Sequence, residues 1–262
     1  MKAAVICLMM LVSYCAQSQI LFSESFNVIL DTAQRVKGSV APELRIQTQK
    51  ELLVEFTNTA DISIRINNSY LTLANKIETG SFGKDVFLSG GYVYAEIVNT
   101  VQKAVTTEIY GQVHWAEARG LNRRYAGGID ARFRLFHRGR SGVFAGIGPF
   151  YEFEQWTHRG VPDERLPSNP LPVDSMNVKM STYISLKHWF FDRVFLDLSL
   201  YHQSRLDEVF YRPRLASSAR LAYQISKHLQ LTGTYQNIYD YQPLVPIDKW
   251  FHRLKASLAV SF

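Results

Sequence analysis

The chain has 262 residues, of which 47% are hydrophobic and 13% aromatic, and its formal net charge is +6. This length suits a single large domain, and the basic residues are scattered singly instead of forming the run that a nucleic-acid patch shows, so we expect no nucleic-acid partner. No later segment stays apolar for about 18 residues, which excludes a transmembrane helix; a membrane β-barrel escapes that test because only every second residue of its strands meets lipid.

The first part of the chain, 1–18, has the pattern of a secretory signal peptide. Lys2 supplies the positive end, a short apolar run follows, and Ala16 and Ser18 are small residues at the spacing of a cleavage site. Residues 19–35 show no clean alternation of apolar and polar side chains. We interpret them as a periplasmic lead-in to the domain that follows.

Both cysteines, Cys7 and Cys15, fall inside the predicted signal peptide. A lipid-modified Cys15 is the alternative, but Tyr14 before it is too bulky for a good lipoprotein cleavage site. The mature chain is therefore expected to have no disulfide and no thiol chemistry. The histidines show no metal-ligand spacing and the glycines form no phosphate-binding loop, so we expect no metal and no cofactor.

From Val36 onward, apolar and polar side chains alternate with the period of two that a strand gives and a helix does not. The pattern recurs about twelve times, and each repeat can supply the roughly 9–11 residues that a tilted membrane-spanning strand needs. The expected strands are 36–47, 51–66, 69–78, 85–98, 103–117, 122–137, 141–157, 176–189, 193–206, 213–227, 229–241 and 250–262. An even number of strands returns both ends of the chain to one side of a membrane, as in single-chain bacterial barrels.

The alternation gives each strand one apolar face and one charged or polar face. In the second stretch, for example, Val54 and Ile62 lie on one parity while Glu55 and Arg65 lie on the other. A soluble sandwich would bury the apolar face, whereas a membrane barrel turns it to lipid and keeps the charged face in the lumen. Parity alone does not choose between these two folds.

The connections choose between them. Links after even-numbered strands are short, whereas two links after odd-numbered strands, 158–175 and 242–249, are long, and this asymmetry is typical of outer-membrane barrels. We therefore predict an all-β fold, an antiparallel up-and-down transmembrane β-barrel of about twelve strands that spans 36–262. It is expected in the bacterial outer membrane, with outer-membrane lipids around it.

The last strand ends on an aromatic residue. Leu258, Val260 and Phe262 share one parity, and this arrangement resembles the assembly signal of bacterial outer-membrane barrels. The resemblance implies that the barrel assembly machinery is a partner and that Phe262 is needed for insertion.

A more specific resemblance lies in Tyr125–Trp156, which contains YAGGIDARFRLF, a tight turn and GVFAGIGPFYEFEQW. A glycine-bearing strand paired with one that ends in alternating aromatic and glutamate residues resembles the salt-induced outer-membrane protein family, often called YdiY-like, whose function is unknown. The resemblance covers most of 36–262, with this hairpin as its specific part. It implies a barrel at the outer membrane and carries over no catalytic residue.

The polar face carries long side chains of both signs. The residues expected to form a charge network in the lumen are Glu108, Asp130, Arg132, Arg134, Glu152, Glu154, Lys179 and Lys187. A selective pore favours one sign along its path, whereas mixed signs let neighbours pair across a narrow lumen. We therefore expect a largely filled lumen, with Glu152 and Glu154 as the acidic half of the network and with Gly128, Gly146 and Gly148 leaving room for bulky neighbours. Whether the network is structural or also contacts a solute is left open.

His202 and Ser204 form the one enzyme-like pair, expected on the lipid face near the outer rim. Outer-membrane phospholipase A is similar in presenting a His-x-Ser pair from the outside of a barrel. Its motif continues with Asn-Gly where this chain has Arg205 and Leu206, and its orienting Asn falls on Ala216 here. Without an orienting partner the pair is a weak nucleophile system. A lipid hydrolase is therefore the alternative to a non-enzymatic envelope protein or narrow channel; the solute and the oligomeric state stay open.

Overall fold

The computed structural model describes residues 35–48, 52–99, 103–191, 193–208 and 211–261. The predicted signal peptide, most of the lead-in and Phe262 lie outside these residues. The strands are β1 (Val36–Thr48), β2 (Leu52–Ile66), β3 (Ser69–Phe82), β4 (Asp85–Asn99), β5 (Val105–Ala116), β6 (Leu121–Arg138), β7 (Ser141–Trp156), β8 (Val173–Phe190), β9 (Val194–Arg205), β10 (Arg214–Gln224), β11 (Leu229–Asp240) and β12 (Trp250–Ser261). Two short 3₁₀ turns, η2 (Glu117–Arg119) and η3 (Asp163–Arg165), lie between strands. None of the helical segments among the described residues has the length and apolar character needed to cross a bilayer.

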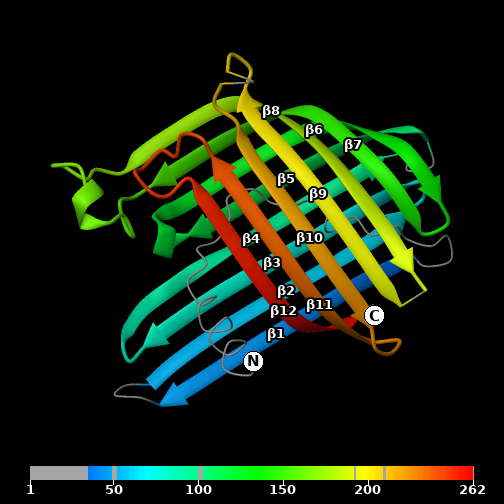
Figure 1. Ribbon diagram of the computed structural model, residues 1–262, viewed down its shortest axis with the longest axis horizontal. Coiled ribbons are helices and arrows are strands. Elements are labelled where there is room, and N and C mark those ends of the chain that lie inside the picture. The colour runs from blue at the N-terminus through cyan, green and yellow to red at the C-terminus, as the bar shows by residue number, and fades with distance from the viewer. Residues whose placement is uncertain (1–34, 49–51, 100–102, 192, 209–210, 262) are drawn as a thin grey trace, which may run out of the picture.

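The strands form one closed barrel in which each strand pairs antiparallel with its neighbours in sequence, and β1 meets β12 (Figure 1). The prediction of an all-β, up-and-down barrel is confirmed. Some strand ends differ by a few residues from the predicted ranges. β3 continues to Phe82, because its ladder with β4 extends past Ile77. β8 already begins at Val173, opposite Trp156 of β7. Neither extension carries the apolar alternation from which strands were predicted.

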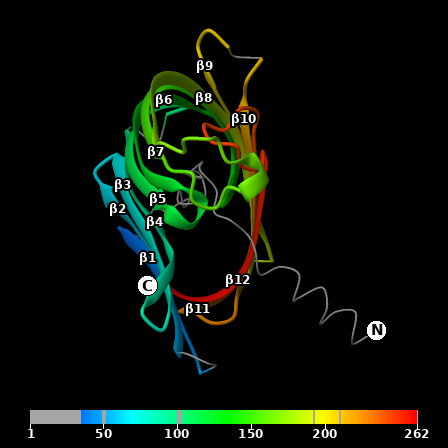
Figure 2. The ribbon, with the colours of Figure 1, turned by 90° about the vertical axis from the view of Figure 1, so that its left-hand side faces the viewer.

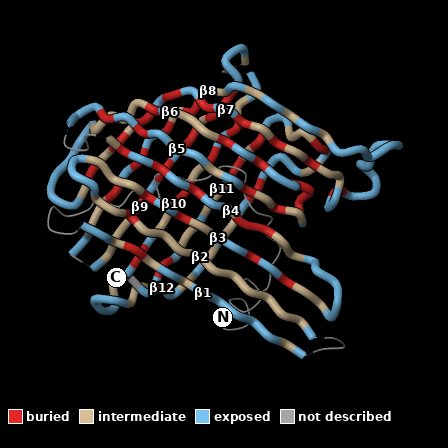
Figure 3. The backbone as a smooth tube through the Cα atoms, turned by 180° about the vertical axis from the view of Figure 1, so that it is seen from behind, coloured by how far each residue is buried: buried red, intermediate tan, exposed pale blue. Residues whose placement is uncertain are grey.

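The barrel has an apolar exterior and a polar interior, the reverse of a soluble protein. On β6, Ile129 and Leu135 are exposed, while Arg124 and Asp130 on the other parity are buried. Figure 3 shows buried and exposed positions alternating along the central strands. Exposed apolar side chains on a closed sheet are stable in lipid, since the backbone groups inside the sheet, apart from those along the β1–β12 seam, are paired within it.

The two ends of the barrel differ. At one end the turns are tight: Asn67, with φ 56°, and Gly139, with φ 57°, adopt the left-handed conformation that two-residue hairpins require. At the other end the β7–β8 connection (157–172) and the β11–β12 connection (241–249) are longer, and we call this the outer end. A closed antiparallel barrel with an apolar exterior, tight turns at one end and long loops at the other is a bacterial outer-membrane protein.

The seam that closes the barrel is short. The β1–β12 ladder consists of Ser39↔Ser261 and Val40↔Val260, whereas β1 pairs with β2 along its whole length. Arg65 N donates to Arg35 O at 2.8 Å, and in an antiparallel ladder this means that odd-numbered residues of β1 bond to β2 and even-numbered residues face β12. The next even-numbered residue above Val40 is Pro42, which has no N–H to donate. The proline therefore ends the seam near the periplasmic end.

Candidate functional site

The interior of the barrel holds the residues predicted for the charge network. Glu108, Asp130, Glu152, Glu154 and Lys187 are buried, and Arg132, Arg134 and Lys179 are half-buried. They form separate groups at different heights in the lumen.

The group nearest the outer end is centred on Glu152 and Glu154 of β7. Arg214 of β10 lies 3.2 Å from Glu152, 3.3 Å from Glu154 and 3.0 Å from Asp240 of β11. Arg124 of β6 pairs with Glu152 and lies 3.6 Å from Glu154. Lys179 of β8 also pairs with Glu152. Three cations and three carboxylates thus compensate one another in a space shielded from water, which is the condition for keeping buried charges.

Arg124, Arg214 and Asp240 were not among the predicted network residues. Arg124 has the same parity as Asp130 on β6, and Arg214 has the same parity as Arg220 on β10, so alternation did mark the first two as inward. Alternation gives no information on which inward residues meet across the lumen, because those contacts depend on strand tilt and stagger.

A second group lies deeper. Tyr183 Oη of β8 donates a hydrogen bond of 2.6 Å to Glu108 Oε2 of β5, and Arg132 Nε of β6 lies 3.3 Å from Glu108 Oε1. Nearer the periplasmic end, Lys187 Nζ lies 3.7 Å from Asp197 Oδ2. The charges along the lumen are therefore of both signs and paired.

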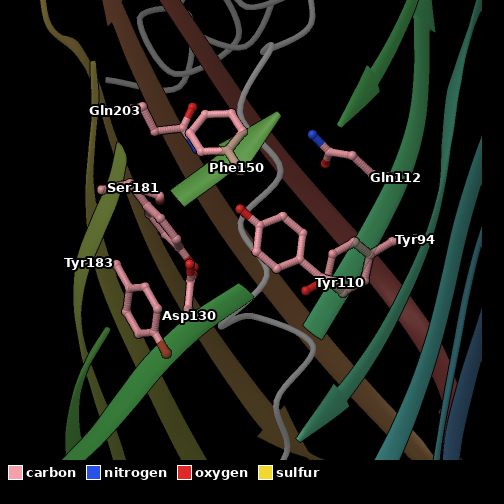
Figure 4. A pocket seen from close by; sticks show the side chains of 9 residues that line it. Tyr94, Tyr110, Gln112, Asp130, Phe150, Ser181, Tyr183 and Gln203 are labelled. Carbon is pink, nitrogen blue, oxygen red and sulfur yellow. The ribbon is translucent and has the colours of Figure 1, made fainter. Parts of the chain in front are cut away.

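Between the Glu152 group and the Lys187–Asp197 pair the lumen narrows to an aromatic constriction. We define it by Tyr94, Tyr110, Phe150, Tyr183 and Tyr201. Figure 4 shows Tyr94 and Tyr110 opposite Tyr183, with Asp130, Gln112 and Gln203 around them. The free space that these side chains leave is about 20 Å³. That is room for about one water molecule and not for a solute.

Glycines provide the space for these rings. A Cβ atom on Gly146 would overlap the Tyr183 ring, and one on Gly128 would lie 2.7 Å from Phe150 Cβ and 2.8 Å from Tyr110 Oη. The expectation that glycines leave room for bulky inward residues is confirmed for Gly128 and Gly146, whereas a Cβ on Gly148 would meet Ile129 O and Asp130 of the neighbouring strand.

A hydrophobic plug covers part of the outer mouth. Trp156, at the end of β7, packs with Val161 of the β7–β8 connection and Val245 of the β11–β12 connection, and all three are buried. Figure 2 shows both connections lying across the mouth. Arg165 Nη1 and Asp248 Oδ1, 2.8 Å apart, join the two connections at the surface. The long loops thus fold inward over the barrel.

Arg119 of η2 lies beneath this plug. Its guanidinium carbon is 3.5 Å from the centre of the Phe251 ring, a cation–π contact. Burial lowers the pKa of Arg119 to about 9, with the Asp240 carboxylate opposing the shift. The side chain remains charged at neutral pH.

A larger cavity of about 490 Å³ lies at the outer end, between β8 and the β9–β10 connection, and reaches Arg214 and Asp240. The cavity forms because the β8–β9 ladder ends at the pair of Lys179 and Arg205. On the outer side of that pair β8 continues alone as far as Val173.

His202 and Ser204 are not arranged as a catalytic pair. His202 shares the outward face of β9 with exposed Leu198 and Leu200, as predicted, but Ser204 is only 3% exposed and lines the outer cavity. The prediction that Ser204 meets lipid is wrong, because the strand ends there beside the cavity. Ser204 Oγ has no hydrogen-bond partner within the described part of the chain, so His202 does not bond to it.

The position that would orient His202 also faces away. Ala216 lies opposite Tyr201 and is buried in the lumen, and Leu215 lies opposite His202. In the described ranges no group of three or more histidine, aspartate or glutamate side chains is placed to hold a metal ion.

No protein-family model matches the sequence, and no curated protein matches it. Similar solved structures include a KdgM porin in complex with disordered oligogalacturonate (10% identity, 87% of this chain and 98% of that chain covered, TM-score 0.45) and the NanC porin (8%, 86% and 97%, 0.42). Another is the translocator domain of the autotransporter NalP from Neisseria meningitidis (10%, 92% and 91%, 0.46). At these low identities and TM-scores the likenesses carry no conclusion about function.

Proposed function

We propose that this chain is a non-enzymatic outer-membrane barrel whose lumen is closed to solutes, an envelope protein or at most a narrow channel. The aromatic constriction carries this proposal, because the pocket that its described side chains line holds only about 20 Å³. An aqueous pore needs a continuous path through that level.

The charge distribution supports the same function. A selective channel lines its path with one sign of charge, whereas here Arg214 is bonded to Glu152, Glu154 and Asp240, and Lys187 faces Asp197. Paired charges hold one another in place and offer little net attraction to an ion.

The alternative of a lipid hydrolase has no specific observation in its favour. The Ser204 hydroxyl is buried and lacks a hydrogen bond from His202, whereas an activated serine needs a base within hydrogen-bond reach. Membership of the salt-induced family and insertion by the barrel assembly machinery stay predictions.

Liposome swelling tests the proposal. Liposomes containing the purified barrel should swell in isotonic arabinose no faster than protein-free liposomes, while a general porin serves as the positive control. The double variant Glu152→Ala, Glu154→Ala should swell faster, because removing both carboxylates loosens the network around Arg214 and Lys179. The matched control is Asp163→Ala, Glu164→Ala, which removes two exposed carboxylates of η3. Wild-type swelling that falls with increasing sugar size would identify an open pore and overturn the proposal.

A further inference from the structure

The outer cavity is of the size that small-molecule sites have. Its volume of about 490 Å³ lies within the roughly 300–1,000 Å³ typical of ligand pockets. Its walls come from the outer ends of β8, β9 and β10 and from the β11–β12 connection, where Gln242, Pro243 and Leu244 line it. It lies outside the aromatic constriction, so a solute could enter it from the outer end without crossing the barrel.

Two polar side chains on β9 reach this cavity without a partner. Gln203 is 9% exposed and Ser204 is 3% exposed, and within the described residues neither Gln203 Oε1 nor Ser204 Oγ makes a hydrogen bond. Figure 4 shows the Gln203 side chain beside Phe150 among the residues of the aromatic constriction, and Gln203 lines the outer cavity as well. Buried polar atoms are nearly always hydrogen-bonded, and an unpaired one costs free energy. Both atoms are therefore available to a partner that enters the cavity.

Most of the charged groups around the cavity are already compensated; Asp174, which also lines it, is exposed and has no ion pair with another described residue. Arg205 bonds to Asp207 at 2.8 Å and Arg212 lies 3.3 Å from Glu208. Arg214 is held by three carboxylates, and Lys179 pairs with Glu152. A strongly charged ligand would have to break one of these pairs and leave a charge uncompensated, at a cost in binding free energy.

We propose that the outer cavity binds a neutral polyhydroxylated solute of the mono- or disaccharide class. A sugar hydroxyl donates to Gln203 Oε1, a second hydroxyl pairs with Ser204 Oγ, and Asn177 and Ser175 on the facing strand supply further polar contacts. Hydroxyl groups satisfy both orphan atoms because each both donates and accepts. They also bring no charge into a compensated site.

Isothermal titration of the purified barrel with maltose tests this site, in a detergent without a sugar headgroup. Maltose should bind saturably with one site per chain. Gln203→Leu, which keeps the side-chain volume but removes the amide, and Ser204→Ala should each weaken binding about five- to tenfold, as the loss of a hydrogen bond in a closed site does. Gln112→Leu is the matched control, because Gln112 lines the aromatic constriction and not the outer cavity.

Heat-modifiable migration in gels establishes that each variant is folded. If Gln203→Leu does not fold, the test rests on Ser204→Ala alone, since Ser204 lies at the end of β9. Absence of saturable maltose binding, or binding that both variants leave unchanged, would overturn the proposal. So would tighter binding of digalacturonate or spermidine, since a charged ligand contradicts a compensated cavity. The titration is independent of closure, because an open pore would not alter the requirement for Gln203 and Ser204.

Discussion

Arg214 Nη1 of β10 lies 3.2 Å from Glu152 Oε2 of β7, although β8 and β9 separate these two strands in the sheet. The contact therefore crosses the interior of the barrel and does not run along its wall. Arg214 also holds Glu154 and Asp240, so one guanidinium ties β7, β10 and β11 together.

Replacing Arg214 should destabilise the barrel strongly. Arg214→Met leaves Glu152, Glu154 and Asp240 with less compensation in a buried site, and removal of one partner from a buried ionic group costs about 3–5 kcal/mol. Urea unfolding of the barrel, followed by tryptophan fluorescence, measures the change. Arg212→Met is the control: its side chain is 49% exposed and pairs with Glu208 four residues earlier, so the change should be about 0.5 kcal/mol or less. Equal effects of the two substitutions would show that the buried network does not stabilise the fold.

A methyl group at position 146 should also be destabilising. Gly146→Ala places a Cβ atom inside the Tyr183 ring, and over-packing of a filled interior costs about 1–3 kcal/mol. Gly111→Ala is the matched substitution, since a Cβ there meets nothing within 4 Å. The same unfolding experiment should find Gly111→Ala as stable as wild type. A tolerated Gly146→Ala would mean that the Tyr183 ring does not occupy the lumen as described.

The short seam predicts an alternating pattern of amide protection along β1. Above Pro42 the odd-numbered residues Glu43 and Arg45 bond to β2, whereas Leu44 and Ile46 face β12 beyond the last ladder pair. Hydrogen exchange followed by NMR should find Glu43 and Arg45 amides protected and Leu44 and Ile46 amides exchanging faster. Uniform protection of the amides along 41–48 would show that β1 and β12 are hydrogen-bonded as far as the outer end.

The C-terminal residue should be needed for insertion and not for closure. Leu258 and Val260 are exposed on the outer face of β12, and Phe262, which lies outside the described residues, continues their parity. Deleting Phe262 should lower the amount of heat-modifiable barrel in outer-membrane fractions. Phe191→Ala, which alters an exposed aromatic in a periplasmic turn, should leave that amount unchanged. Normal insertion of the deletion variant would contradict the assembly role.

Much of this architecture could be predicted from the sequence because a period of two is local. Whether Ile129 or Asp130 faces lipid follows from neighbours two residues away. The unequal lengths of the links between strands then favoured a membrane barrel over a soluble sandwich. The closure could not be predicted in the same way. Val161 and Val245 lie in connections without periodicity, so nothing local indicated that they pack on Trp156.

The contact of Arg214 with Glu152 was also beyond local pattern. It depends on how tilt and stagger bring strands to one height in the lumen. Ser204 was misplaced for a related reason: parity assigned it to the lipid face, but the end of the β8–β9 ladder puts it beside a cavity.

Closure of the lumen is tested most directly by recording the current through single wild-type barrels in a planar bilayer. With the aromatic constriction and the plug in place, wild type should conduct little at moderate voltage. Tyr183→Ala should raise the conductance or its noise, because it removes one ring of the constriction and the bond to Glu108, while Tyr183→Phe, which keeps the ring, should stay closed. A large, steady, ion-selective current through the wild-type barrel would contradict the account and make this protein a porin.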